Sequence, residues 1–173
     1  MPQGVEVARC TAVLLREAAV QLPAAAQASD VAPPAPETGR PIPDQARRWS
    51  PYFTGVDTRV IEGDLMQPGP AAVWFRHLRP VVAGEADTPL MAAVAAADLG
   101  SGIAATVDLR RWSFVNAEMT VYLHRPPAGN WMLNRSTMRL DRRGIGLTTM
   151  VLEDTAGPFG AASQSLLIEP RSA

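Results

Sequence analysis

The sequence predicts an α+β fold in which a curved antiparallel sheet wraps around one central apolar helix. Three observations lead to this fold class. A nearly apolar helical segment follows Asp87, two candidate strands precede it, and four strand-like segments joined by short turns follow it. A helix that is apolar on most sides must be covered on most sides, and a single curved sheet can cover it in this way.

The helix is predicted to begin at Asp87 or Thr88, because either residue can cap a helix and Pro89 fits a first turn. The residues that follow, L-M-A-A-V-A-A-A-D-L, favour a helix. Gly100 is the expected end, and Gly100–Gly102 is interpreted as a helix stop followed by a small loop.

The strands are predicted from runs of β-forming residues bounded by Pro, Gly, Asp and Asn. The segment Phe114–His124 alternates most regularly, with Val115, Ala117, Met119, Val121 and Leu123 on one face. The six expected strands of the main domain are Phe53–Glu62, Ala71–Leu78, Phe114–His124, Trp131–Leu140, Ile145–Glu153 and Ala161–Ile168.

The N-terminal part of the chain differs in composition. Val5–Leu15 is expected to form a strand, but it has no hairpin partner before it. Residues 17–48 are interpreted as an Ala- and Pro-rich linker, or as a chain section that wraps over a surface, because five prolines between Pro33 and Pro43 oppose regular structure. The main domain is expected to span residues 49–173.

The composition argues against several classes of protein. The net charge is −1 at pH 7, so no strong field favours a nucleic acid or a membrane surface as partner. The single cysteine, Cys10, provides no disulfide or cysteine-based zinc site and is expected to be buried. His77 and His124 are too far apart in sequence to suggest a metal site. No apolar stretch approaches ~20 residues and the N-terminus lacks signal-peptide features, so we expect a cytoplasmic protein without metal or cofactor.

Three polar residues stand out against their apolar surroundings. Asp98 lies near the end of the helix, where a carboxylate is buried, faces a cavity or simply reaches water. Asn116 lies early in a strand, where Asn is depleted, although it could bond to local backbone instead. Gln164 lies between small residues in the last strand, which suggests close packing by another element or an exposed position. Taken singly, none of the three defines a site.

The segment from Thr88 to Arg171 resembles the C-terminal half of the TesB-like acyl-CoA thioesterases, a double-hotdog family. The matching stretches are P-L-M-A-A-V-A-A-A-D-L-G-S-G (89–102), F-V-N-A-E-M-T-V-Y-L-H-R-P-P (114–127), G-N-W-M (129–132), G-I-G-L-T-T-M-V-L-E-D (144–154) and A-A-S-Q-S-L-L-I (161–168). The resemblance is looser back to Trp49. Residues 1–16 resemble the end of a first hotdog and are expected to be its remnant strand.

The resemblance implies a hotdog fold and hydrolysis of acyl-CoA thioesters to a free fatty acid and CoA, without a cofactor. In the family a helix Asp, a Thr or Asn on the next strand and a Gln on the last strand hold the nucleophilic water. These positions correspond to Asp98, Asn116 and Gln164, with Asn116 where the best-known members have Thr. Glu118 is expected to be solvent-facing or structural. No G-x-S-x-G motif supports a serine hydrolase.

Two other functions remain open at this point. A hotdog hydratase or dehydratase would need a histidine paired with the acid, and neither histidine is placed like one. A non-catalytic hotdog half could bind acyl groups or support a partner. In each case we expect a homodimer or pairing with another hotdog, because an open sheet edge invites pairing. Five arginines in the last four strands and their turns could meet CoA phosphates, but they are more typical of solvated strand and turn positions: Arg125, Arg135, Arg139, Arg142 and Arg143.

Overall fold

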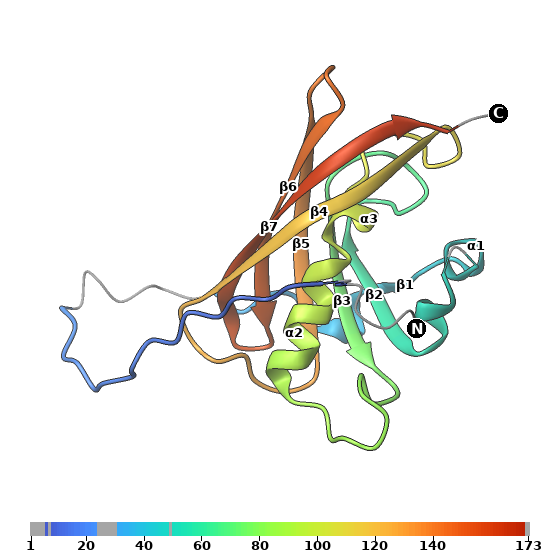
Figure 1. The fold of residues 1–173 in the computed structure, drawn as a ribbon. Coiled ribbons are helices and arrows are strands. Elements are labelled where there is room, and N and C mark those ends of the chain that lie inside the picture. The colour runs from blue at the N-terminus through green and yellow to red at the C-terminus, as the bar shows by residue number, and fades with distance from the viewer. Residues whose placement is uncertain (1–5, 7, 24–30, 49, 172–173) are drawn as a thin grey trace.

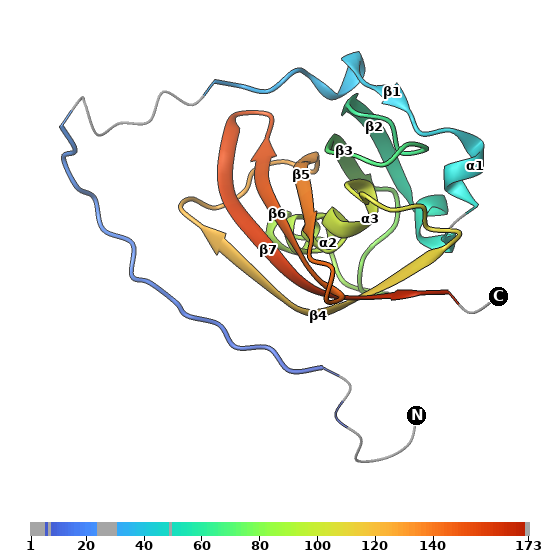
Figure 2. The ribbon, with the colours of Figure 1, turned by 90° about the horizontal axis from the view of Figure 1, so that it is seen from above.

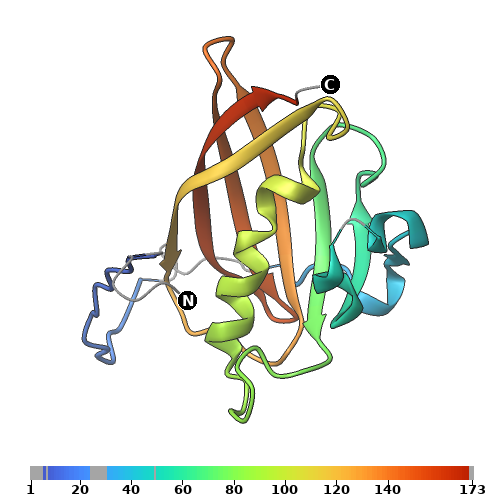
Figure 3. The same ribbon diagram turned by 45° about the vertical axis from the view of Figure 1, so that its right-hand side comes forward.

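Seven strands form one antiparallel sheet that curves around a central helix (Figure 1; Figure 3). The computed structural model describes residues 6, 8–23, 31–48 and 50–171. The spatial order is β1-β2-β3-β5-β6-β7-β4, which leaves β4 at one edge. The hotdog fold class is therefore confirmed. The strands are β1 (Arg40–Pro41), β2 (Val56–Glu62), β3 (Ala71–His77), β4 (Trp112–Leu123), β5 (Met132–Leu140), β6 (Ile145–Asp154) and β7 (Gly157–Pro170).

The strand predictions hold to within a few residues, with the largest shifts at β2 and β7. β2 begins at Val56 because Pro51–Thr54 forms a 3-10 helix, η3, whose start is capped by the Ser50 hydroxyl. β7 begins at Gly157 and ends at Pro170, so it is longer than predicted at both ends. Short turns join β5, β6 and β7, and successive strands therefore pair as neighbours.

The central helix α2 (Pro89–Asp98) begins as predicted but ends differently. The Thr88 hydroxyl accepts a hydrogen bond from the Met91 N–H at 3.2 Å, and Pro89 occupies the first turn. After Leu99 the chain forms a second short helix, α3 (Gly100–Ile103), instead of the predicted loop. Gly100 allows this because it packs directly against Met150, at a place where any Cβ would overlap the methionine sulfur. The glycine is thus a close-packing residue within the helical segment.

β4 does not alternate as predicted. Its pairing with β7 shifts register between Asn116 and Glu118, which marks a β-bulge with Ala117 as the extra residue. An extra residue reverses the face to which the following side chains point. Val115 before the bulge is therefore exposed, whereas Met119 after it packs against the core. The prediction of one continuous apolar face was wrong. Because of the bulge, Asn116 before it and Met119 after it both face the concave side.

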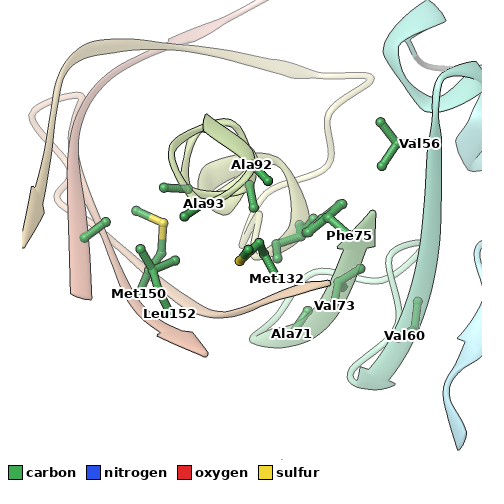
Figure 4. Packing of buried hydrophobic residues seen from close by; sticks show 14 of the residues in the cluster. Val56, Val60, Ala71, Val73, Phe75, Ala92, Ala93, Met132, Met150 and Leu152 are labelled. Atoms are coloured by element: carbon green, nitrogen blue, oxygen red, sulfur yellow. The ribbon is translucent and has the colours of Figure 1, made fainter. Parts of the chain in front are cut away.

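The main core lies between α2 and the concave face of the sheet (Figure 4). Four alanines of α2 are buried there, and their small side chains let the helix approach the sheet closely. Ala71 and larger side chains from four strands fill the space around them: Val56, Val60, Val73, Phe75, Met132, Met150 and Leu152. This packing fixes the position of α2 and of the acid at its C-terminal end.

Residues 34–48 wrap around the β2 side of the sheet (Figure 2). The Trp74 indole N–H donates to the Pro34 carbonyl at 3.0 Å, and β1 pairs with β2. Ile42 and Ala46, the latter in the short helix α1 (Asp44–Arg47), are buried in the main core. The region expected to be linker is therefore packed from about Pro34 onward, as in the surface-wrapping alternative.

The expected strand Val5–Leu15 is not formed by the residues that the structure describes. Val5 and Val7 lie outside those residues, and residues 8–23 have no regular secondary structure and are exposed (Figure 2). Cys10, which we expected to be buried, is exposed as well. An unpaired strand leaves its backbone groups to water, and so an isolated strand is not stable. None of the described helices is long and apolar enough to cross a membrane.

Candidate active site

Asp98 is the last residue of α2 and lies on the one face of this helix that the sheet leaves open. Val94 and Leu90, one and two turns earlier, are 38% and 49% exposed, and Asp98 is exposed too. The acid is therefore neither buried nor inside a cavity, contrary to two of the three sequence alternatives. An exposed carboxylate among apolar neighbours can meet both water and an apolar ligand.

Asn116 reaches Asp98 from the edge strand. Its Nδ2 donates to Asp98 Oδ1 at 3.3 Å. Asn116 is the last residue of β4 before the bulge at Ala117. The alternative that Asn116 only bonds to local backbone is wrong, because its partners are side chains on the α2–α3 segment.

Gln164 joins the same group from the middle of β7. It is completely buried, and its Nε2 donates to the Asp98 backbone carbonyl at 3.0 Å. Its Oε1 accepts the Ser101 N–H at 3.1 Å. The alternative of an exposed polar position was wrong. The structure thus brings Asp98, Asn116 and Gln164 together, with Gln164 bonded to backbone groups of the helix junction (α2 to α3).

Ser101 is the residue of this group that the sequence did not reveal. Its hydroxyl lies 3.1 Å from Asn116 Oδ1, so hydrogen bonds run in a ring from the Asp98 carboxylate through Asn116, Ser101 and Gln164 to the Asp98 carbonyl. Gly100–Gly102 was interpreted as a loop without a role. A serine between two glycines gives no periodic signal, and only the continuation of the helix into α3 turns it toward the sheet.

Glu118 lies on the opposite side of the bulge. Its carboxylate accepts hydrogen bonds from the Ser165 N–H and hydroxyl and from the Thr120 hydroxyl. The Ser165 hydroxyl, followed by the Thr120 hydroxyl, lowers the pKa of the Glu118 carboxyl. Glu118 is exposed, so its interpretation as a solvent-facing structural residue is confirmed. It ties β4 to β7 at the register shift.

Three of the five arginines considered for CoA phosphates form ion pairs with acidic residues of the sheet. Arg125 pairs with Asp154, Arg143 with Asp141, and Arg135 with both Glu62 and Glu153. These pairs link neighbouring segments of the domain. The structure gives no reason to place a phosphate at any of the three.

A second polar pair lies beside α2. The Tyr52 hydroxyl and His77 Nε2 are 2.7 Å apart. Burial lowers the pKa of His77, an effect that the charge of Asp87 partly offsets. Burial, with a contribution from the Asp98 charge, raises the pKa of Tyr52 to about 12. His124 is exposed, and neither histidine hydrogen-bonds to Asp98.

Two cavities flank the helical segment but do not contain the ring of hydrogen bonds. The larger, of about 550 Å³, lies beyond α3 and is lined by Gly102, Ile103, Arg110 and Arg171, among others. The smaller, of about 200 Å³, lies between His77 and the start of α2. Asp98, Asn116 and Gln164 line neither cavity. Gln164 is buried, and Asp98 is the member of the group that is exposed, next to the open face of α2.

Comparison with known proteins identifies the family. The model of the acyl-CoA thioesterase C-terminal domain matches residues 36–168, which is well over half of the chain. The chain belongs to this family. The matched residues include the wrapping segment after Pro36 as well as the helix and the last four strands. A comparison with functionally curated proteins gave no match.

Solved structures agree on the fold. Acyl-CoA thioesterase II TesB2 from Mycobacterium marinum is 19% identical, with a TM-score of 0.57, over 88% of this chain and 60% of its own length. A hot dog fold protein of unknown function from Alicyclobacillus acidocaldarius is 18% identical, with a TM-score of 0.61, over 91% and 59%. A thioesterase family protein from Silicibacter pomeroyi is 11% identical, with a TM-score of 0.55, over 73% and 95%. The chain therefore spans about 60% of the length of the first two relatives.

Proposed function

We propose that this domain hydrolyses acyl-CoA thioesters through a water molecule activated by Asp98. The position of the Asp98 carboxylate carries this proposal. One of its oxygens is held by Asn116, and among the described residues nothing hydrogen-bonds to the other. A carboxylate fixed at one oxygen and open at the other is suited to accept a proton from water. Membership of the acyl-CoA thioesterase family supports the class of substrate.

The reaction has two steps. The water gives a proton to Asp98 Oδ2 while its oxygen bonds to the thioester carbonyl carbon, and the carbonyl electron pair moves to the oxygen to form an oxyanion. Backbone N–H groups are the expected donors to this oxyanion. The intermediate then collapses, the carbon–sulfur bond breaks, and the CoA thiolate takes the proton from Asp98. The products are a fatty acid and CoA.

The other members of the ring have positioning roles in this scheme. Asn116 orients the Asp98 carboxylate and can present its second Nδ2 hydrogen to the water. Gln164 is buried and bonded through both ends of its amide to the backbone of the helix junction, so in this scheme it holds Asp98 and Ser101 in place rather than contacting the water. A hydratase or dehydratase has less support, because neither histidine hydrogen-bonds to Asp98.

Release of the CoA thiol, followed with a thiol-reactive dye, tests the activity on saturated acyl-CoAs of short to long chain length. Cys10 is exposed and would react with the dye, so a Cys10→Ser variant is the right background. We expect thiol release from at least one chain length. If acyl-CoA binds by calorimetry but no thiol appears at any length, the non-catalytic acyl-binding alternative replaces this proposal.

Asn116→Ala and Gln164→Ala are each expected to lower turnover. The fold loss of the double variant should be smaller than the product of the fold losses of the two single variants. Both residues act on the same carboxylate through one ring of hydrogen bonds, so we expect a coupling of roughly 0.5–3 kcal/mol in a double-mutant cycle. The assay is run well below the melting temperature of each variant, because Gln164→Ala also leaves two buried backbone groups unpaired. The exposed Gln67→Ala is the control, and full additivity would show that the two residues act separately.

We also propose that the domain works as a homodimer. β4 is an edge strand of twelve residues, and the neighbouring open face of α2 exposes Leu90 and Val94 beside Asp98. Long unprotected edges invite pairing, and pairing of identical edges gives a two-fold dimer. A second copy would cover the apolar face and give the acyl chain a wall opposite α2.

Light scattering at low micromolar concentration is expected to show a dimer. Specific activity should rise with protein concentration over the range in which the dimer forms. Val94→Glu, which puts a charge on the open face of α2, should weaken the dimer, whereas Leu167→Glu on a similarly exposed strand position should not. A stable monomer with full activity would contradict the dimer proposal.

A further inference from the structure

Ser101 makes two chemically independent interactions within the site. Its side chain is nearly buried, since the residue is 3% exposed. Its backbone N–H donates to Gln164 Oε1, and its hydroxyl lies 3.1 Å from Asn116 Oδ1. Any residue other than proline supplies the N–H, but only a hydroxyl side chain can supply the second interaction in the same place. Substitution of Ser101 therefore isolates the hydroxyl.

The direction of the Ser101 hydrogen bond follows from Asp98. An ionised carboxylate only accepts hydrogen bonds, so the Asn116 amide must turn its Nδ2 toward Asp98, as it does at 3.3 Å. Asn116 Oδ1 then faces Ser101, and the serine hydroxyl must be the donor. A flipped amide would place Oδ1 against the carboxylate, and two acceptors facing each other lose a hydrogen bond.

The Asn116 amide has few other restraints. Within the described part of the chain, its side chain bonds only to Asp98 and Ser101. The residue lies on an edge strand next to a bulge, and Asp98 is exposed. The nearly buried Ser101 hydroxyl is therefore the firmer of the two anchors.

We propose that Ser101 is a positioning residue that fixes the orientation of the Asn116 amide and, through it, the Asp98 carboxylate. This inference rests on the proposed function, because the group that is positioned is the proposed base. It assigns a role to α3, which brings the hydroxyl to the sheet. A serine that only filled space would tolerate alanine, which fits the same volume.

Ser101→Ala is expected to lower kcat roughly tenfold, because small displacements of a catalytic group are amplified in rate. KM and the melting temperature should stay close to wild type, and Ser101→Thr should retain more activity than Ser101→Ala. Ser113→Ala, which removes a hydroxyl that bonds the Glu169 carbonyl, is the matched control. In an Asn116→Ala background, Ser101→Ala should not lower kcat any further. Wild-type kcat for Ser101→Ala, or an equal loss in both backgrounds, would overturn the proposal.

The side-chain amide resonance of Asn116 gives a second readout that does not depend on turnover. It is assigned by its absence from the Asn116→Ala spectrum. In Ser101→Ala we expect this resonance to shift and broaden as the amide loses its fixed orientation, and an unchanged resonance would overturn the positioning role. If the wild-type protein released no thiol, the proposed function would fail, while this spectrum would still decide the role of Ser101.

Discussion

Asp98→Asn is expected to lower the turnover of acyl-CoA thioesters by ~10²–10⁴-fold, the loss typical when a general base is removed. The fold should survive the change. Asp98 is exposed, and the hydrogen bond from Gln164 goes to its backbone carbonyl, which the substitution retains. Asparagine also matches aspartate in size, so the helix junction keeps its packing. The effect should therefore fall on kcat, with an unchanged melting temperature.

Glu85→Gln is the matched control for this experiment. It removes an exposed acid from the loop before α2 without touching the ring of hydrogen bonds. Its turnover should equal that of the wild type. Turnover close to the wild-type rate in a well-folded Asp98→Asn protein would rule out Asp98 as the base.

Arg125→Met is expected to lower the free energy of unfolding by about 3–5 kcal/mol, the usual effect of leaving a buried charge without its partner. Asp154 is fully buried, and its two oxygens lie 2.6 and 2.8 Å from the Arg125 guanidinium. Arg125 also donates to the Gly157 and Pro158 carbonyls, so it fastens the end of β4 to β7. Urea unfolding measures the loss.

The pH dependence of this loss provides a second check. Burial raises the pKa of the Asp154 carboxyl, but hydrogen bonds from Arg125 and from the Ala128 and Ala156 N–H groups outweigh it, and the net pKa is lowered. In the wild type the resulting stability is present above pH ~4, the ordinary range of Asp, and is lost as the pH falls through the folded pKa. Without Arg125, only the Ala128 and Ala156 N–H groups oppose the effect of burial, and we expect that pKa to rise.

The difference in stability between Arg125→Met and the wild type should accordingly shrink as the pH is lowered toward 4. Arg143→Met is the matched control, because Arg143 pairs with Asp141 in an exposed turn and such pairs contribute roughly 0–1 kcal/mol. Equal losses of unfolding free energy in the two variants would show that the burial of Asp154 does not make its ion pair more stabilising than an exposed one.

Much of the fold could be predicted from local signals. The Thr88–Pro89 start and the alanine-rich run define α2, and short polar turns separate β5, β6 and β7. The exceptions depend on contacts between distant segments. The bulge at Ala117 is visible only in the pairing of β4 with β7, and residues 34–48 pack because Trp74, Ile42 and Ala46 find partners in the folded sheet.

The candidate site, too, was predictable only where the signal is local in the sequence. Asp98 is conspicuous because it interrupts an apolar run, and family resemblance pointed to Asn116 and Gln164. Their geometry depends on the bulge and on α3, which a period-2 or helical pattern does not encode. For this reason the sequence did not predict a role for Ser101. Gly100 is typical of a helix end, and only its contact with Met150 explains why the chain stays helical there.

Hydrolysis of an acyl-CoA in water labelled with heavy oxygen, with enzyme in excess so that each site turns over once, tests the central claim most directly. If Asp98 activates a water that attacks the thioester itself, the fatty acid released in that single turnover carries the label. The peptide that contains Asp98 then carries none. An unlabelled fatty acid together with label in the Asp98 carboxylate would contradict the account, because the carboxylate would then have attacked the thioester as a nucleophile.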